Sequence, residues 1–421
     1  MTGRIGRLIA AMAALALFAG AAMAAAAPVQ EGGAAPSPPA LEALYRAAMQ
    51  SIAEGRKSDA SEALKRVVDI EPKHAGAWLD LALIQCGLGH SDEAERLFAA
   101  IETRFDPPPG ILALIAETRE RGCNRWNRFS SSSLTIGRGF DSNVNQGANN
   151  PNFSIARGAS AIELHLLPEF LPMADQYSVL SAETMRDISA NGSIGFVQAQ
   201  FRHNDRLNRF DSGALFAGVE TPWRLGRWTL RTTATLGMVS LGRQLYQRHG
   251  QAQARIGLPL PLPASTRFSL LAGLSHTGYL KLTNFNSNTV ELRPQLTWRN
   301  SERMASASIG YQRDLGEPAR PGGDRHGLLL SLLGQQVLPY GMTAELAYSR
   351  QQWNSASAYS PGLIEQTRSQ ATSILRGNLS YPISKNQSLQ LELRAVHNRE
   401  NISIFQYNNR QVQLSWQSHI P

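Results

Sequence analysis

Residues 289–299 read Thr-Val-Glu-Leu-Arg-Pro-Gln-Leu-Thr-Trp-Arg, and polar and apolar side chains alternate along the whole stretch. Because successive side chains of a β-strand point to opposite faces, this stretch forms a strand with one polar and one apolar face. A soluble β-sandwich and a membrane barrel would both show this pattern, so the rest of the chain has to separate them. The same alternation recurs in residues 228–238, 267–277, 388–397 and 411–418.

The N-terminus has the features of a secretory signal peptide, predicted over residues 1–24. Arg4 and Arg7 precede an apolar run over residues 8–21, and Ala22 and Ala24 supply the small side chains of a cleavage site. A transmembrane anchor is the alternative, but the run is shorter than the ~20 residues that span a bilayer. Since no later run of 18 apolar residues exists, any membrane crossing is expected to use strands.

Together these features favour a closed β-barrel in a bacterial outer membrane, with lipid on the apolar side and a hydrated lumen on the polar side. Such barrels have even strand numbers, so we predict fourteen strands within residues 131–421. A fifteenth apolar stretch, 159–167, is assigned to one long loop, 144–173, that either covers the rim or enters the lumen. The predicted strands are residues 131–143, 174–188, 193–203, 209–221, 228–241, 247–258, 265–279, 287–299, 304–314, 325–338, 341–353, 366–381, 387–399 and 405–418.

Turn lengths give the barrel an orientation. Short turns, such as 300–303, alternate with longer connections, such as 279–286 and 354–365, as periplasmic turns alternate with outer loops. This parity places the segment before the first strand in the periplasm. Aromatic residues at the strand ends are predicted to form an interfacial girdle. They are Trp126, Trp223, Trp228, Trp298, Tyr340, Trp353, Tyr381, Tyr407 and Trp416.

Residues 40–122 are predicted to be helical and contain a repeat of 34 residues, which is the tetratricopeptide layout of paired antiparallel helices. A Pro- and Ala-rich linker, 25–39, precedes them, and a second linker, 123–130, follows. Residues 109–121 are predicted to cap two repeats, with a concave peptide-binding groove or a simple spacer as the two possible roles. The repeat positions are Gly55 and Gly89, Ala60 and Ala94, Leu64 and Phe98, and Val67 and Ile101, with Trp78 and Leu81 on the first helix of the second copy.

The two cysteines, Cys86 and Cys123, lie at the second repeat and just after the cap. In an oxidising periplasm they could form a disulfide between these elements. Two thiols that never meet are the alternative, because sequence does not give the distance between their Cα atoms.

Composition excludes some classes of partner. The chain has 421 residues, enough for two domains, and a net charge of +8 that comes mostly from arginine. There is no basic run of a nucleic-acid-binding module, so we expect no nucleic-acid partner and place the arginines in the lumen and at the rims. Glu291 with Arg293, and Glu392 with Arg394, are expected to form a cross-strand ionic ladder or, alternatively, a selectivity filter.

The sequence predicts no enzyme, metal site or cofactor. The nine histidines are scattered without metal-ligand spacing, and there is no nucleophile elbow or phosphate-binding loop. One local motif stands out at the end of the first strand, Gly-Phe-Asp-Ser-Asn-Val-Asn over residues 139–145. Its side chains favour a turn, with oxygen ligands for a hard cation as the alternative. The residues of interest are Phe140, Asp141, Ser142, Asn143 and Asn145.

This motif, the C-terminal stretch 398–412 and the order of signal peptide, short tetratricopeptide domain and fourteen-strand barrel resemble the surface lipoprotein assembly modulator (Slam) family. The resemblance implies an outer-membrane protein of Gram-negative bacteria that helps a client protein reach the cell surface. The client would be a surface lipoprotein or a secreted soluble protein, often one that acquires haem or metal. The implied partners are this client, outer-membrane lipid and the barrel-assembly machinery.

The chain departs from the usual barrel ending, because it continues past Trp416 to residue 421 instead of stopping at an aromatic residue. Its repeat array is also short. A polysaccharide exporter and a general porin-like channel with a tetratricopeptide adaptor are the alternative functions, and the two repeats argue against the exporter, which usually has a far longer array.

Overall fold

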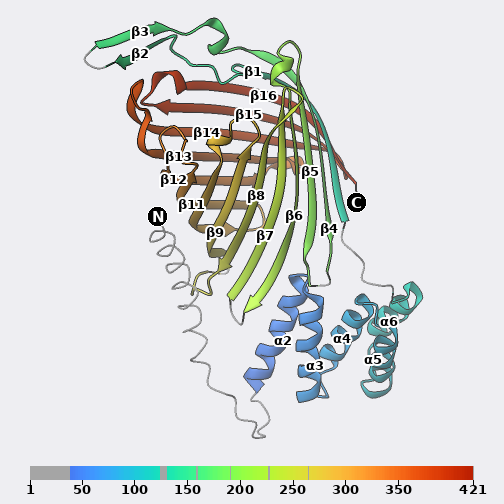
Figure 1. The fold of residues 1–421 in the computed structure, drawn as a ribbon. Helices are drawn as coiled ribbons and strands as arrows, with labels where there is room; N and C mark the ends of the chain where they lie inside the picture. The colour runs from blue at the N-terminus through green and yellow to red at the C-terminus, as the bar shows by residue number, and fades with distance from the viewer. Residues whose placement is uncertain are drawn as a thin grey trace, which may run out of the picture.

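A computed structural model describes residues 38–123, 130–157, 160–189, 191–225, 228–263 and 265–420. The chain forms a helical domain followed by a closed barrel (Figure 1). The predicted signal peptide with Ala22 and Ala24, nearly all of linker 25–39, and the girdle residue Trp126 lie outside the described residues.

The helical domain begins slightly before the predicted boundary and contains five helices. They are α2 (Pro38–Ala53), α3 (Lys57–Ile70), α4 (Ala75–Gly87), α5 (Ser91–Arg104) and α6 (Pro109–Arg121). Helices α2 with α3 and α4 with α5 form two hairpins, and α6 is the predicted cap. Within the described residues, no helix is both long and apolar enough to cross a membrane.

The repeat positions account for the packing of this domain. Six of them are fully or nearly fully buried, since they lie where the helices cross. Gly55 and Gly89 have φ values of +76° and +82°, so each allows the tight turn inside a hairpin. Trp78 is only half-buried, and its indole N–H donates to the Pro72 carbonyl at 3.1 Å. The buried repeat positions are Ala60, Leu64, Val67, Ala94, Phe98 and Ile101, and Leu81 joins the same core.

Fourteen antiparallel strands close the barrel, as predicted, with β1 paired to both β4 and β16. The strands are β1 (Ser130–Asp141), β4 (Asp175–Asp187), β5 (Ile194–Asn204), β6 (Ser212–Leu225), β7 (Trp228–Leu241), β8 (Gln244–Gly257), β9 (Thr266–Tyr279), β10 (Ser287–Arg299), β11 (Arg303–Gly316), β12 (Arg325–Val337), β13 (Thr343–Ser360), β14 (Ile364–Ser384), β15 (Gln387–Glu400) and β16 (Tyr407–Ile420). Short 3₁₀ helices occur in the connections, namely η1 (Pro168–Phe170), η2 (Asn208–Phe210), η3 (Thr283–Phe285), η4 (Pro339–Gly341) and η5 (Ser403–Phe405).

The long loop predicted over residues 144–173 forms a separate two-stranded sheet, β2 (Asn152–Arg157) with β3 (Ser160–His165). Figure 1 shows this hairpin above the end of the barrel that faces away from the helices. Of the two predicted placements, the loop therefore covers the rim. We call this end the far rim and the end beside the helical domain the near rim.

The two faces of the wall follow the alternation seen in residues 289–299. Leu292, Leu296 and Trp298 are exposed on the outward face, while Glu291 and Arg293 form an ion pair at 2.8 Å on the inward face. That pair lies within one strand, and the partner of Glu392 is Arg376 on the neighbouring strand at 3.0 Å. The predicted cross-strand ion pairing is therefore found at Glu392, with Arg376 and not Arg394 as its partner, and is wrong for Glu291 and Arg293, which pair along one strand.

The aromatic girdle is also only partly as predicted. Five of the predicted residues point outward at the near rim, and Tyr340 is 87% exposed in the turn before β13. Trp353 and Tyr407 instead face the lumen close to the far rim, because they share a face with inward Arg325 and Asn398, respectively. The five outward residues are Trp223, Trp228, Trp298, Tyr381 and Trp416.

The segment 354–365, predicted as a long outer loop, is mostly strand. Strands β13 and β14 continue to Ser360 and from Ile364, with two register shifts in this extension. The segment is rich in serine and alanine and lacks the alternation of large apolar side chains that would have marked it as a strand in the sequence.

Candidate functional site at the far rim and in the helical domain

Asp141 ends β1 and is 2% exposed, at the centre of a hydrogen-bond network on the far rim. Its Oδ2 accepts from Arg202 Nη2 at 2.6 Å and from Gln411 Nε2 at 2.9 Å. Its Oδ1 accepts the backbone N–H of Asn143 at 2.9 Å. One carboxylate thus links β1 to β16 and, across the lumen face of β4, to β5.

Asn143 extends the network beyond the last ladder pair of β1 and β16. The side chain is 1% exposed, and its Nδ2 donates to the carbonyls of Gly147 at 3.0 Å and Asn408 at 2.9 Å. Its Oδ1 accepts the Gly147 N–H at 2.7 Å. The Ser142 N–H donates to the Arg410 carbonyl at 3.0 Å. The motif therefore acts as a turn that fastens the seam between the first and last strands.

Asn145 and Phe140 complete the motif in different ways. Asn145 Nδ2 donates to the Leu171 carbonyl at 2.8 Å, and its Oδ1 accepts the Met173 N–H at 3.0 Å. These bonds hold the end of the long loop against its beginning. Phe140 takes no part in the network and lies 43% exposed on the outward face.

The alternative of a cation site in this motif gains no support from the geometry. The Asp141 oxygens already accept from a guanidinium, an amide and a backbone N–H. Among the residues that the structure describes, no group of three or more His, Cys, Asp or Glu side chains could hold a metal ion.

Gly139 shows why the motif begins with glycine. A Cβ at this position would lie 2.5 Å from the ring of Tyr177, which is 3% exposed and packed against the inward face of β1. Arg202 stacks over this ring, with its guanidinium carbon 3.8 Å from the ring centroid. The glycine thus admits the tyrosine that positions Arg202 beside Asp141.

Further carboxylates are buried on the inward face of the far rim and have arginine partners, as Asp314 and Glu400 show. Asp314 bonds Arg325 at 2.6 Å and Arg320 at 2.8 Å, so the loop between β11 and β12 turns back toward the wall. Glu400 bonds Arg368 at 2.7 Å. Charge pairs therefore join neighbouring strands at several places around the far rim.

The long loop and its neighbours surround a hollow of about 720 Å³ at the far rim. The Asn149 N–H donates to the Gln406 carbonyl at 2.9 Å, which ties the long loop to the connection between β15 and β16. Leu167 and Phe170 remain 61% and 53% exposed, so the loop presents apolar surface to its surroundings. The hollow is lined by residues 145–148, Leu166, Glu169, Phe170, Arg209, Phe210, Ile404 and Phe405.

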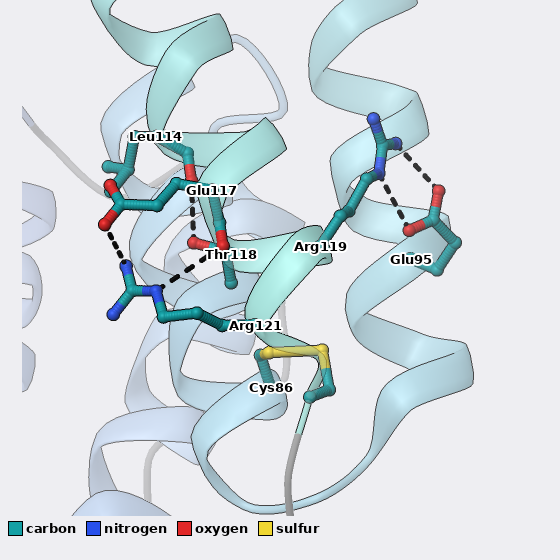
Figure 2. The surroundings of a disulfide bond; sticks show 8 residues. Cys86, Glu95, Leu114, Glu117, Thr118, Arg119 and Arg121 are labelled. Carbon is teal, nitrogen blue, oxygen red and sulfur yellow. Dashed lines mark hydrogen bonds and ion pairs between the residues drawn. A yellow bond between two sulfur atoms is a disulfide. The ribbon is translucent and has the colours of Figure 1, made fainter.

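In the helical domain, Cys86 and Cys123 form the disulfide that was one of the two predicted possibilities (Figure 2). Their Cα atoms are 4.5 Å apart, and the bond joins the end of α4 to the second residue after α6. A hollow of about 430 Å³ lies beside it, lined by Leu83, Leu114, Thr118 and Arg121 among others. The chain therefore leaves the helical domain from a fixed point, immediately before the segment that leads to β1.

Ion pairs hold the cap on the repeats. Arg119 of α6 binds Glu95 at 2.7 Å and Glu102 at 2.6 Å, both on α5, and the first of these pairs is visible in Figure 2. Hydrogen bonds to Glu102 and Glu95 raise the pKa of Arg119 above its already high value, so this arginine stays charged. The predicted capping helix is thus fastened near its C-terminal end by both the ion pairs and the disulfide.

The first helices of the two repeats meet through Tyr45 and Asp80. The Tyr45 hydroxyl donates to Asp80 Oδ2 at 2.6 Å. Burial, together with this hydrogen bond and the charge of Asp80, raises the pKa of Tyr45 to about 12. The Tyr45 ring also packs against His74, with 4.5 Å between the ring centroids.

The helical domain touches the near rim where the turn between β4 and β5 meets the turn between α2 and α3 (Figure 1). A Cβ added at Gly192 would lie 3.4 Å from the Glu54 carbonyl oxygen and 3.5 Å from that of Gly55. The backbones of the two turns, each of which contains a glycine, therefore lie close together. The repeats therefore stand beside one edge of the barrel mouth.

The sequence missed several residues that build the far rim. Arg202 and Tyr177 lie far from the 139–145 motif in the chain, and only the strand register brings them to Asp141. The alternation within its strand predicts that Arg202 faces inward, but it does not predict that Asp141 is its partner. Asn408 and Asn409 lie in the C-terminal stretch 398–412, to which only the family resemblance drew attention.

Comparison with known proteins identifies one part of the chain. A family model described as a tetratricopeptide repeat matches residues 51–117, which include most of the two hairpins and the cap. A comparison with curated proteins gave no match.

Solved structures similar to the barrel include three outer-membrane proteins. A loop L8 deletion mutant of OmpT of Vibrio cholerae is 5% identical, with 70% of this chain and 99% of that chain covered and a TM-score of 0.39. An anion-selective porin from Comamonas acidovorans is 8% identical, with 70% and 99% covered and a TM-score of 0.37. The outer membrane channel DcaP of Acinetobacter baumannii is 9% identical, with 70% and 97% covered and a TM-score of 0.39. Similarity at this level gives no information about function.

Proposed function

We propose that this protein is an outer-membrane translocon that helps a specific exported protein reach the cell surface. The observation that carries the proposal is the placement of a tetratricopeptide domain against the near rim of a closed barrel whose inward face is polar. Such repeats commonly bind peptide segments on their concave face. The resemblance of the motif 139–145 and of the C-terminal stretch to the Slam family supports the same function.

In this proposal the helical domain lies in the periplasm and recruits the client, and the barrel offers the route outward. The disulfide fixes the point at which the chain leaves the helical domain, and the contact at Gly192 places the repeats beside the mouth of the barrel. The folded loop on the far rim presents Leu167 and Phe170, which could receive an emerging polypeptide. No step of this function requires covalent chemistry.

The test is to express the protein with an exported protein encoded beside it and to measure how much of that client a protease removes from intact cells. We expect surface exposure of the client to fall when residues 40–122 are deleted, while the barrel still folds and inserts. A matched control is the substitution Arg46→Gln, which removes only an exposed ion pair on α2. Unchanged client exposure after deletion of the whole barrel, residues 131–421, would exclude the proposal.

A porin-like channel is the second candidate, and the polar lumen face favours it. Planar-bilayer recording separates the two functions. A general channel gives a large, steady conductance that is independent of residues 40–122, whereas a translocon gives a small conductance that changes when the client is added.

A further inference from the structure

The outward face of the barrel wall is cationic. In the described strands, up to the irregular extension of β13 and β14, every aspartate and glutamate faces the lumen, whereas the outward positions include arginines and no carboxylate. A wall that only met hydrocarbon would carry neither charge. The outward arginines are Arg138, Arg186, Arg248, Arg303, Arg313, Arg350, Arg399 and Arg410.

These arginines are unevenly distributed between the two rims. Five of them lie close to the far-rim ends of their strands, and all five are exposed. We call this group the far-rim arginines: Arg138, Arg248, Arg313, Arg399 and Arg410. The near rim instead has the outward aromatic residues, with Arg186 and Arg303 as its only outward arginines among the described strands.

Within the strands, the neighbours of the far-rim arginines on the same face are neutral or weakly basic. Arg313 pairs across the ladder with His326, and Arg399 Nε donates to His397 Nε2 at 2.9 Å. His276 Nδ1 and Asn288 Oδ1 are 2.9 Å apart between β9 and β10. Polar groups that can donate to an anion therefore continue around this level of the wall.

Only one far-rim arginine has a carboxylate partner. Arg138 forms two hydrogen bonds with Asp205, in the connection after β5, and this contact holds the pKa of Asp205 below its usual range. The other four have no ion pair with a carboxylate of the described chain. On the inward face, by contrast, Arg202, Arg325 and Arg376 each have an acidic partner.

Lipid phosphates are the anions that this arrangement fits. A guanidinium binds phosphate through two parallel hydrogen bonds, and its long stem can rest on the apolar wall while the charge stays at the headgroup level. Three of these arginines, Arg399, Arg410 and Arg138, come from the adjoining strands β15, β16 and β1, and the register places each of them four positions, roughly 13 Å, along the ladder from the next. A row of positive charges at this spacing is best matched by a headgroup with more than one phosphate.

We propose that the far-rim arginines bind phosphate-bearing headgroups of the lipids in the leaflet that surrounds the far rim. The proposal rests on the proposed membrane location of the barrel, but it does not depend on any client. It gives the two rims different roles, since aromatic side chains anchor the near rim and charge pairing with lipid anchors the far rim.

The test uses the full chain isolated in detergent and native mass spectrometry with diphosphorylated lipid A as the probe. We expect bound lipid A on the wild-type protein and binding about tenfold weaker or more for the variant Arg248→Gln/Arg313→Gln/Arg399→Gln/Arg410→Gln. The matched control is Arg186→Gln/Arg303→Gln, which removes two outward arginines from the near rim and should bind as the wild type does. Inorganic phosphate at the same concentration should not displace the lipid.

A second comparison needs no variant and so does not depend on how well one folds. Dephosphorylated lipid A, which keeps the acyl chains, should bind the wild-type protein at least about tenfold more weakly than the diphosphorylated form. Equal binding of the two lipids, or equal binding by the fourfold variant with an unchanged circular dichroism spectrum, would overturn the proposal. Lipid binding without client export would contradict only the proposed function, and client export without lipid binding only this inference.

Discussion

Asp141 joins three strands through one side chain, and this gives a residue-scale prediction about stability. Asp141→Asn removes the charge that faces Arg202, whose side chain is only 19% exposed, and it weakens the bond from Gln411. We expect a loss of roughly 2 kcal/mol in the free energy of unfolding, since a hydrogen bond between charged groups is lost at a mostly buried site.

The measurement is urea unfolding in detergent micelles, followed by the shift in gel migration between folded and unfolded barrel. Asp205→Asn is the control, because it removes a carboxylate–arginine pair from the exposed outward face. That control should shift the midpoint little. Equal midpoints for the Asp141 variant and the wild type would contradict the role given to this network.

Tyr45 gives a second residue-scale prediction, about pH. Its pKa is raised to about 12 in the fold and is about 10 in an unfolded chain, so the neutral hydroxyl is favoured by folding. The stabilisation is therefore complete below pH 10 and is lost as the pH rises through about 12. Thermal unfolding of the helices, followed by circular dichroism between pH 8 and pH 12, should show this loss.

Tyr45→Phe should flatten this part of the pH profile, because the titrating group is gone. It should also cost about 1 kcal/mol at neutral pH through the lost hydrogen bond to Asp80. Tyr340→Phe is the matched control, since Tyr340 is 87% exposed in a near-rim turn. A profile for Tyr45→Phe with the same decline as the wild type would show that another group is responsible.

At the scale of elements, the disulfide decides how firmly the cap is held. Cys86 and Cys123 are 37 residues apart, and closing a loop of that length contributes about 4 kcal/mol through the unfolded chain. Cys86→Ser/Cys123→Ser should therefore lower the urea midpoint of the helical signal and leave the barrel signal unchanged. Reductant should reproduce this effect in the wild type and do nothing to the double variant.

Features that belong to a single strand could be predicted from the sequence, whereas contacts between two strands could not. Residues 289–299 alone show both faces of β10, and the count of fourteen strands follows from such segments and from parity. The partner of Glu392 could not be found this way, because Arg376 and Arg394 both face the lumen and only the register selects Arg376.

Two errors had different physical origins. Trp353 was assigned to the girdle from its place near a strand end, although counting from outward Leu346 already puts it on the inward face. The extension of β13 and β14 could not be seen, because beyond the apolar band of the wall a strand has no apolar face to mark it. The site at Asp141 was half predicted: the motif was visible, but Arg202 and Tyr177 were not.

At the scale of the whole molecule, the helical domain and the β2–β3 hairpin lie at opposite ends of the barrel (Figure 1). If the barrel spans the outer membrane as proposed, protease added to intact cells should cut the far-rim hairpin and leave residues 38–123 intact. Permeabilised cells should lose the helical domain as well. Cleavage of the helical domain in intact cells would reverse the proposed orientation.

The seam between β1 and β16 also has a consequence for the order of assembly. The bond from Gln411 to Asp141 joins residues 270 positions apart in the chain, a contact that can form only after the strands between them are in place. Closure is therefore expected to be the last event of folding, and until then the edge of β1 stays open. Weakening the Asp141 network should lengthen the lifetime of an open, unclosed sheet more than it slows the earlier strand pairings.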